Sequence, residues 1–262
     1  MQVMMQEEKI APIRTKQILG IKFFDGSAEE AVGYIARHGG LVVAPAAPSL
    51  IALQHDEEYR RAIADADLAI ADSGWMVNFW WLLRRERVTR ISGLTYFKRL
   101  VERPECREPG KLFWILPSEE SKAKTLAWSR SVGLPTTADD CYVAPRYGAI
   151  AEDEKLLSIV QDRRPQHVIV AIGGGMQDKI GRYLKHRCGY RAAIHCIGAA
   201  PGFVTGDQVA IPGWADRFFL GWIFRIIAQP RVFIPRFWSV RKLPGMILRY
   251  DRELPARKQS KM

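Results

Sequence analysis

Short apolar runs alternate with amphipathic helical segments along most of this chain, and that alternation restricts the fold more than any single motif does. Runs such as LVVAPA, KLFWILP and HVIVAIGGG are separated by segments such as SAEEAVGYIARHG and EDEKLLSIVQDRR, in which apolar residues recur at helical spacing. Strands that alternate with helices build a parallel sheet with helices on both faces. We therefore expect an α/β protein with five or six parallel strands.

Local signals refine this pattern. Residues 17–24 (QILGIKFF) predict a single first strand, and residues 49–66 (SLIALQHDEEYRRAIADA) predict one helix. Ser27 with Glu30 three positions later forms a capping box, which predicts the start of a helix. His195 stands in an apolar strand, where a hydrogen-bonded core histidine is expected.

Basic charge is concentrated at the C-terminal end. The chain has a net charge of +11, and residues 217–262 carry eleven Lys or Arg against two acidic residues. The preceding 216 residues therefore carry only about +2. We expect a parallel, Rossmann-like α/β domain over residues 1–212 and a basic, aromatic, helical appendage over residues 213–262.

Aromatic residues alternate with the arginines of this appendage. Aromatic and basic side chains on short helices suit an anionic membrane surface, where rings lie at headgroup depth and cations bind phosphates. We expect such a membrane as the partner and no nucleic acid, although basic charge alone also suits nucleic acid. A C-terminal helix that packs on the core is a further alternative. The aromatic residues are Trp214, Phe218, Phe219, Trp222, Phe224, Phe233, Phe237 and Trp238.

Cysteine usage and the N-terminal sequence indicate the cytosol. The four cysteines lie far apart without a C-x-x-C pair, so neither a disulfide framework nor a zinc site is predicted. The first residues, MQVMMQEEKIAPIRTK, lack the apolar core of a signal peptide, and the longest apolar stretches are too short to span a bilayer. We expect a cytoplasmic protein bound peripherally at the inner face of the cell membrane.

Polar residues at strand ends mark the candidate site, because ligands of parallel sheets bind beyond the carboxyl ends of the strands. The run LVVAP ends at Ala44 and Pro45, and the run DLAIADSG ends with Asp72 and Ser73. A carboxylate that follows four apolar residues suits a catalytic base or a ligand acceptor. An Asx-turn or an N-cap for the next helix is the alternative role of Asp72.

Three consecutive glycines lie in the run VIVAIGGGMQDKI, which reads as a strand, a turn and a helix start. Glycine lets backbone N–H groups approach a ligand closely, and a helix N-terminus carries partial positive charge, so this bend suits a phosphate or diphosphate. A plain strand-to-helix turn is the alternative, because Asp178 stands where a dinucleotide fingerprint has its last glycine. The candidate ligand residues are Gly173, Gly174, Gly175, Gln177 and Asp178.

Metal-binding signals are weak in this sequence. Asp65 and Asp67 form a D-x-D pair, but they precede their strand and so lie at the wrong end of the sheet for a ligand. The five histidines have no metal-ligand spacing. We therefore expect neither a metal nor another cofactor.

Four segments resemble the WecG/TagA/CpsF glycosyltransferase family: ADLAIADSGWMV, RISGLTYFKRL, VIVAIGGGMQDKIGRYL and GAAPGFVTGDQVAIPGWADRFFLGWIFRIIAQPRVFIPRF. The likeness runs from about Gln17 to Trp238. It implies an inverting transfer of a sugar from a UDP-sugar to a polyprenyl-diphosphate-linked acceptor, without a D-x-D-bound metal. Such enzymes make bacterial surface polysaccharides and exopolysaccharides.

The resemblance also implies roles for individual residues. Asp72 matches the aspartate of the family's D-G pair, which is the proposed base for the acceptor hydroxyl, and Ser73 replaces the glycine of that pair. Arg90, in RISG, resembles the arginine that is expected to face the donor diphosphate. Arg87, in RERV, is the alternative register for that role.

The glycine bend and the appendage carry further implied contacts. GGGMQDK resembles the family's G-x-G-x-P-x-Q-E segment, with Gly175 at the proline position and Asp178 in place of glutamate. WIFRIIAQPRVFIPRF resembles the family's W-x-x-R-x-x-x-x-P-x-R-x-x-x-R-Y ending, which is thought to cover the active site at the membrane. That ending implies substrate contacts for Arg225, Arg231 and Arg236.

Departures from the family pattern bear on substrate and turnover. Ala44, Pro45 and Ala46 replace a T-P-N turn that is thought to hold substrate, and Gly221 stands where glutamate is usual. We expect an active hexosyltransferase with changed sugar selectivity, and UDP-glucose as its donor because the amide-binding turn is missing. The alternative is a family member that has lost turnover and binds lipid-linked sugar or a partner enzyme. The apolar segment FWWLL could supply the seam of a homo-oligomer.

Overall fold

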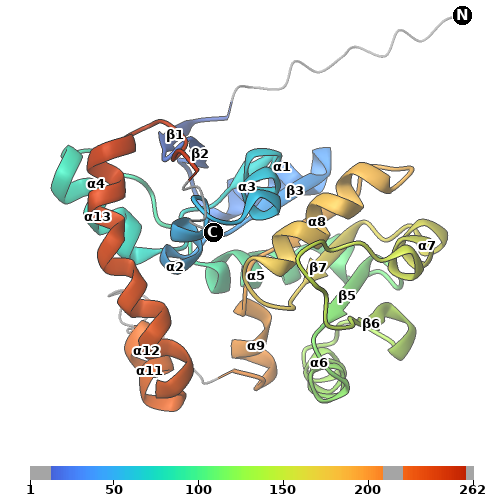
Figure 1. Ribbon diagram of the computed structural model, residues 1–262. Helices are drawn as coiled ribbons and strands as arrows, with labels where there is room; N and C mark the ends of the chain where they lie inside the picture. Colours follow the sequence, from blue (N-terminus) through green and yellow to red (C-terminus); the bar gives the residue numbers. More distant parts are fainter. Residues whose placement is uncertain (1–12, 209–220, 258–262) are drawn as a thin grey trace, which may run out of the picture.

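The described residues form one eight-stranded sheet with helices on both faces (Figure 1). The computed structural model describes residues 13–208 and 221–257. The strand order is β1-β2-β4-β3-β8-β7-β5-β6, and only β1 runs antiparallel to its neighbour. The expected α/β fold with a mostly parallel sheet is confirmed, with more strands than the five or six predicted. The strands are β1 (Thr15–Ile18), β2 (Ile21–Phe24), β3 (Gly40–Val43), β4 (Leu68–Ala69), β5 (Leu112–Leu116), β6 (Cys141–Val143), β7 (His167–Val170) and β8 (Ala193–Cys196).

Alternating residues of the central strands supply two separate apolar cores, one on each face of the sheet. Leu41 and Val43 of β3 point to one core, whereas Val42 between them points to the other. The first core is covered by α2 (Ala47–Ala52), α3 (Glu57–Ala64), α4 (Gly74–Arg84), α7 (Glu154–Arg163), α8 (Met176–Arg187) and α13 (Leu243–Tyr250). The second is covered by α1 (Ala28–His38), α5 (Gly93–Val101), α6 (Glu119–Ser131) and α9 (Ala200–Thr205).

Two sequence-based element predictions are wrong in detail, and one is confirmed. Residues 17–24 do not form a single strand, because Leu19 and Gly20 both have positive φ (50° and 76°) and turn the chain back as the β1–β2 hairpin. Residues 49–66 form two helices, because the Asp56 carboxylate accepts the Tyr59 N–H and starts α3 anew. The capping box of Ser27 at the start of α1 is present in both directions.

The C-terminal helices pack on the first core as well as on each other. Helices α11 (Gly221–Ala228) and α12 (Pro230–Ser239) are followed by a 3-10 turn, η3 (Val240–Lys242), and by α13, and they run along one side of the molecule (Figure 1). Leu243 and Ile247 of α13 are fully buried. The chain then reaches the β1–β2 hairpin, where the Leu19 N–H donates to the Asp251 carbonyl at 2.9 Å. The predicted domain boundary at 212/213 lies outside the described residues and stays a prediction. Two further 3-10 turns are η1 (Pro104–Arg107) and η2 (Ala138–Asp140).

A buried polar chain crosses the centre of the sheet on the second face. The Tyr96 hydroxyl lies 3.0 Å from His195 Nδ1, and His195 Nε2 lies 3.1 Å from His167 Nδ1. His167 Nε2 lies 3.8 Å from Glu105, which favours a proton on that nitrogen, so that Tyr96 and His195 each donate toward His167. Both rings are fully buried, which confirms the expected core role of His195. Burial lowers the pKa of His167 to about 4, and it also lowers the pKa of His195 well below its usual value.

These histidines predict a loss of stability in acid. In the unfolded chain a histidine takes up a proton near pH 6.5, whereas folded His167 stays neutral down to about pH 4, so protons favour the unfolded state between these values. As the pH falls through that window, the wild type should lose up to about 3 kcal/mol relative to His167→Gln, at about 1.4 kcal/mol per pH unit. Urea unfolding of both proteins at several pH values measures the difference. A difference that does not change with pH would contradict the assignment.

Candidate active site

A cavity of about 660 Å³ lies at the carboxyl ends of four neighbouring strands, β4, β3, β8 and β7. The segments that follow β3, β4 and β7 were the predicted site, and residues 197–200 after β8 complete the ring. Because these four strands are parallel, their ends meet at one edge of the sheet. The predicted residues that line this cavity are Asp72, Ser73, Arg90, Gly173, Gly174, Gly175, Gln177 and Asp178.

The Asp72 carboxylate is held at the cavity wall by the helix that follows it. Its Oδ1 accepts the backbone N–H of Gly93 at 2.8 Å, in the first turn of α5. Ser73, not Asp72, is the N-cap of α4, since its hydroxyl accepts the Met76 N–H at 3.2 Å. Asp72 is half-buried, so its carboxylate is fixed in direction and still borders the cavity. This geometry suits a base that must meet a substrate at one place.

Arg90 reaches the cavity beside Asp72. Its Nε donates to the Asp72 carbonyl at 3.0 Å, and its side chain is half-buried. Arg87, the alternative for the same role, is exposed and does not line the cavity. Of the two registers, the geometry therefore favours Arg90 as the cation that faces a ligand.

The glycine bend turns the chain through backbone angles that favour glycine. Gly173 and Gly175 have φ of 102° and 87°, and no atom lies within 4 Å of a Cβ built at either position. A hydrogen bond links the bend to the segment that follows β8, because Gln177 Oε1 accepts the N–H of Gly198 at 3.0 Å. Asp178 Oδ2 accepts the Gly175 N–H at 3.0 Å and so takes one of the amides that a ligand could use.

Asp178 is a buried carboxyl group in the floor of the cavity. It is 2% exposed, and its Oδ1 has no hydrogen-bond partner among the described residues. Burial raises its pKa to about 7, against the effect of the Gly175 N–H. Tyr59 lies beside it at the start of α3, and burial together with the Asp178 charge raises the pKa of Tyr59 well above its usual range, while the Ser49 hydroxyl opposes this. The floor is therefore polar, and its Asp178 carboxyl is neutral below about pH 7.

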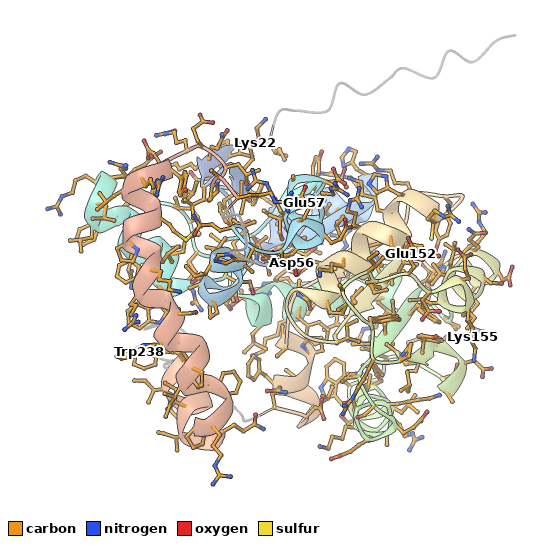
Figure 2. The ribbon with its side chains drawn as sticks, in the orientation of Figure 1. Lys22, Asp56, Glu57, Glu152, Lys155 and Trp238 are labelled. Carbon is orange, nitrogen blue, oxygen red and sulfur yellow. The ribbon has the colours of Figure 1, made fainter. Side chains whose placement is uncertain are left out.

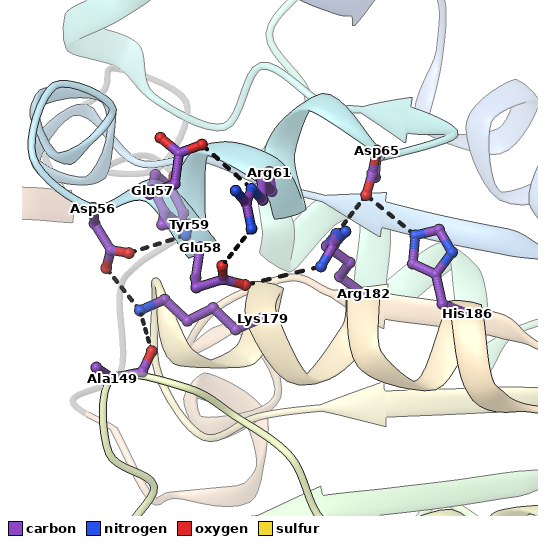
Figure 3. Close-up of polar contacts among 10 residues, drawn as sticks. All are labelled: Asp56, Glu57, Glu58, Tyr59, Arg61, Asp65, Ala149, Lys179, Arg182 and His186. Carbon is purple, nitrogen blue, oxygen red and sulfur yellow. Dashed lines mark hydrogen bonds and ion pairs between the residues drawn. The ribbon is translucent and has the colours of Figure 1, made fainter. Parts of the chain in front are cut away.

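Ion pairs clamp the first turns of α3 and α8 together beneath this floor (Figure 3). The Lys179 ammonium is nearly buried and lies 2.8 Å from the Asp56 carboxylate, and it donates to the Ala149 carbonyl at 3.0 Å. Asp56 is at once the N-cap of α3 and a cavity residue. Because Asp56 and Lys179 each belong to a helix start, their ion pair fixes how far apart Tyr59 and Asp178 lie.

The D-x-D pair lies away from the cavity and is engaged by cations. Asp65 contacts Arg182 and His186, and Asp67 lies 2.8 Å from both Lys185 and Arg191. Neither aspartate lines the cavity. Among the described residues, no cluster of three or more His, Cys, Asp or Glu side chains is placed to hold a metal ion.

Aromatic side chains from α4, α11 and α12 form the wall opposite the glycine bend. Trp75 of α4 has its ring centroid 5.4 Å from that of Trp222, which in turn lies 5.9 Å from Phe237. Phe233 stacks on Phe237 at 6.2 Å, and all four rings line the cavity. We call these four residues the aromatic wall. Trp222, Phe233 and Phe237 were predicted to contact a membrane surface, which stays a prediction, and the structure shows that they line the cavity.

The arginines of the appendage are only partly placed. Arg231 is exposed on α12 and does not line the cavity. Arg225 lies in α11 and Arg236 in α12, but their side chains fall outside the described part of the structure. Trp214, Phe218 and Phe219 also lie outside the described residues. The implied substrate contacts of the three arginines therefore stay predictions.

Sequence reasoning missed several cavity residues. Ser49, Asp56 and Tyr59 belong to a segment predicted as one helix, so no helix start was expected at Asp56. The Asp56–Glu57–Glu58 run, a capping residue followed by acidic residues, was a signal that could have located it. The end of β8 at Gly198 could have been found with the same strand-end rule that identified Asp72.

The buried Asp178 carboxyl predicts a pH-dependent stability cost. The folded protein keeps its proton up to about pH 7, whereas the unfolded chain releases it near pH 3.8, so rising pH favours unfolding between these values. The wild type should therefore lose up to about 4 kcal/mol relative to Asp178→Asn as the pH rises from about 4 to 7. Urea unfolding at several pH values measures this, with the exposed Asp162→Asn as the control variant. A difference for Asp178→Asn that does not change with pH would contradict a neutral buried carboxyl.

The comparison with known protein families agrees with this geometry. A model of the Glycosyl transferase WecG/TagA/CpsF family matches residues 16–260, which is nearly the whole chain. No curated protein matches the sequence. The match includes every strand but the first residue of β1, and it includes all the residues that line the cavity. The chain therefore belongs to the WecG/TagA/CpsF family of glycosyl transferases.

Proposed function

We propose that this glycosyltransferase moves a hexose from a UDP-sugar, with inversion, onto a polyprenyl-diphosphate-linked saccharide during synthesis of a bacterial surface polysaccharide or exopolysaccharide. One observation carries the proposal. Asp72, Arg90 and the glycine bend at 173–175 border one cavity, although more than 80 residues separate Arg90 from the bend. A base, a cation and backbone amides are the groups that inverting sugar transfer uses.

The proposed step assigns a role to each group. The acceptor hydroxyl attacks the anomeric carbon as its proton passes to the Asp72 carboxylate, while the bond from that carbon to the UDP oxygen breaks. The leaving diphosphate gains charge, which Arg90 and the amides of the bend stabilise. Because this assigns the charge stabilisation to protein groups, the proposed transfer is metal-independent and needs no cofactor.

The turn after β3, residues 44–46, is relevant to the identity of the donor sugar. Ala44, Pro45 and Ala46 line the cavity with small apolar groups, and Ala46 gives α2 no side-chain cap. An apolar turn offers no partner to a sugar amide, and an unpaired buried amide is costly. We therefore assign UDP-glucose as the donor in preference to an N-acetylated sugar.

Exposed apolar side chains support a membrane-bound enzyme at the inner face of the cell membrane. Among the described residues eight large apolar side chains are exposed, and six of them lie on α4, α11, α12 or α13. On the C-terminal helices, Ile234 and Trp238 (labelled in Figure 2) recur at helical spacing with Arg231 and Arg241. The Arg241 guanidinium lies 4.4 Å from the centroid of the Trp238 ring. Alternating rings and cations suit anionic headgroups.

None of the helices in residues 13–208 and 221–257 has the length and apolar character that crossing a bilayer requires. Trp81 and Leu82, in the FWWLL segment of α4, are also exposed. Their exposure supports the proposal that a second copy of the chain packs on this helix.

Substitution of the base tests the proposed reaction. Asp72→Asn preserves the acceptor for the Gly93 N–H but cannot take a proton, so turnover should fall about 100- to 10,000-fold. Release of UDP from UDP-glucose with a lipid-linked acceptor measures turnover, and calorimetric titration with UDP should show unchanged affinity. Asp139→Asn, an exposed aspartate, is the control. Wild-type protein that binds UDP but turns over no donor would favour the alternative, a family member that only binds lipid-linked sugar or a partner enzyme. One observation supports that alternative: Gly221 lines the cavity at a position where the family usually has glutamate, so no carboxylate is present there.

Substitution of the exposed rings tests membrane binding. The double change Ile234→Ser with Trp238→Ser removes two exposed apolar side chains and should weaken binding to phosphatidylglycerol vesicles on the order of 10-fold or more. Ile150→Ser, at an equally exposed apolar residue outside these helices, should bind like the wild type. Sedimentation with vesicles measures both. Equal losses in the two proteins, or binding to duplex DNA without vesicle binding, would contradict the membrane proposal.

A further inference from the structure

We propose that the aromatic wall, Trp75, Trp222, Phe233 and Phe237, binds the isoprenoid chain of the acceptor at the end that carries the diphosphate. This inference rests on the proposed function and adds to it a binding site for the apolar part of one substrate. The proposed donor is polar throughout, yet the four aromatic rings of this wall line the cavity.

The wall is a continuous apolar surface built from three helices. Rings from α4, α11 and α12 touch in sequence, with centroid separations of 5.4 Å and 5.9 Å from Trp75 through Trp222 to Phe237. These rings are only partly buried, so each still presents apolar area to the cavity. Apolar area left facing a cavity is stabilised by an apolar ligand, because burial removes it from water.

The orientation of the rings favours a chain over a sugar. Successive rings are tilted by 53° between Trp75 and Trp222 and by 55° between Trp222 and Phe237. A pyranose ring stacks on one flat aromatic face, whereas tilted rings leave an uneven surface with grooves between them. The methyl-branched chain of an isoprenoid fills such grooves with many short van der Waals contacts.

The helix α12, which carries two rings of the aromatic wall, lies between the cavity and the proposed membrane surface. Phe233 and Phe237 line the cavity, while their sequence neighbours Ile234 and Trp238 on α12 are more than half exposed. One short helix thus has an apolar side toward the cavity and an apolar side toward the surface. A chain anchored in a bilayer can pass along this helix and bring the end that carries the diphosphate and saccharide into the cavity that Asp72 borders.

Binding of farnesyl diphosphate tests the inference without turnover. Calorimetric titration of the full-length protein should give an affinity for farnesyl diphosphate on the order of 100-fold above that for inorganic diphosphate, which corresponds to about three or four buried methylene groups. Trp222→Ala should lose at least about 10-fold of that advantage and keep its affinity for inorganic diphosphate. Phe237→Leu, which preserves apolar volume and folding, should keep most of the advantage.

Ile150→Ala is the control, because Ile150 is 64% exposed and lies outside the C-terminal helices and the cavity. It should bind farnesyl diphosphate like the wild type. Equal affinity of the wild type for both diphosphates, or an equal loss in Ile150→Ala, would overturn the inference. A loss of UDP-glucose affinity in Trp222→Ala with farnesyl diphosphate binding unchanged would also overturn it and assign the wall to sugar stacking. Failure of the wild type to bind UDP would instead refute the proposed function, whatever the farnesyl diphosphate result.

Discussion

The parallel pairing of β4, β3, β8 and β7 is the constraint on which the rest of this molecule depends. Parallel strands end at the same edge of a sheet, so four segments that are far apart in sequence converge there. Each strand end then passes into a turn or a helix start, and the N–H groups of those turns hold the side chains that face the cavity. The Gly93 N–H on the Asp72 carboxylate is one such contact, and the Gly198 N–H on Gln177 is another. The geometry of the site is thus a consequence of the sheet and of its helix caps.

Charge is distributed unevenly around this cavity, and that distribution suits a ligand with a diphosphate. Lys179 pairs with Asp56 beneath the floor, and burial raises the pKa of Asp178 to about 7, so that the acid is protonated below that pH. An ionised Asp178 would repel a diphosphate held at the glycine bend, whereas the neutral acid does not. Asp72 and Arg90 both border the cavity, and the Arg90 Nε donates to the Asp72 carbonyl. The opposite wall is aromatic, so one cavity offers separate surfaces to a polar donor and to an acceptor with an apolar chain.

The sequence predicted the fold class and the strand-end residues, because both follow from short-range patterns. Apolar runs such as residues 168–172 are visible without a structure, and the rule that ligands bind beyond the carboxyl ends of parallel strands places Asp72 and the glycine bend together. The hairpin at Leu19 was missed because Leu19, a non-glycine residue, adopts a positive φ there. No local sequence pattern predicts that conformation for a leucine. The cavity roles of Tyr59, Trp222 and Phe237 depend on how helices pack against one another. An amphipathic pattern shows that a helix has an apolar side, but it does not show whether that side meets the core, a membrane or a substrate.

The central claim is that a single cavity holds the base, the cation and the glycine bend around the diphosphate of a UDP-sugar. A crystal structure of the Asp72→Asn protein with UDP tests this claim most directly. We predict that the UDP diphosphate lies within hydrogen-bond distance of the Arg90 guanidinium and of the backbone amides of Gly173 and Gly174, with the side chain at position 72 facing the position of the missing sugar. A diphosphate bound outside this cavity, or one that contacts neither Arg90 nor the bend, would contradict it.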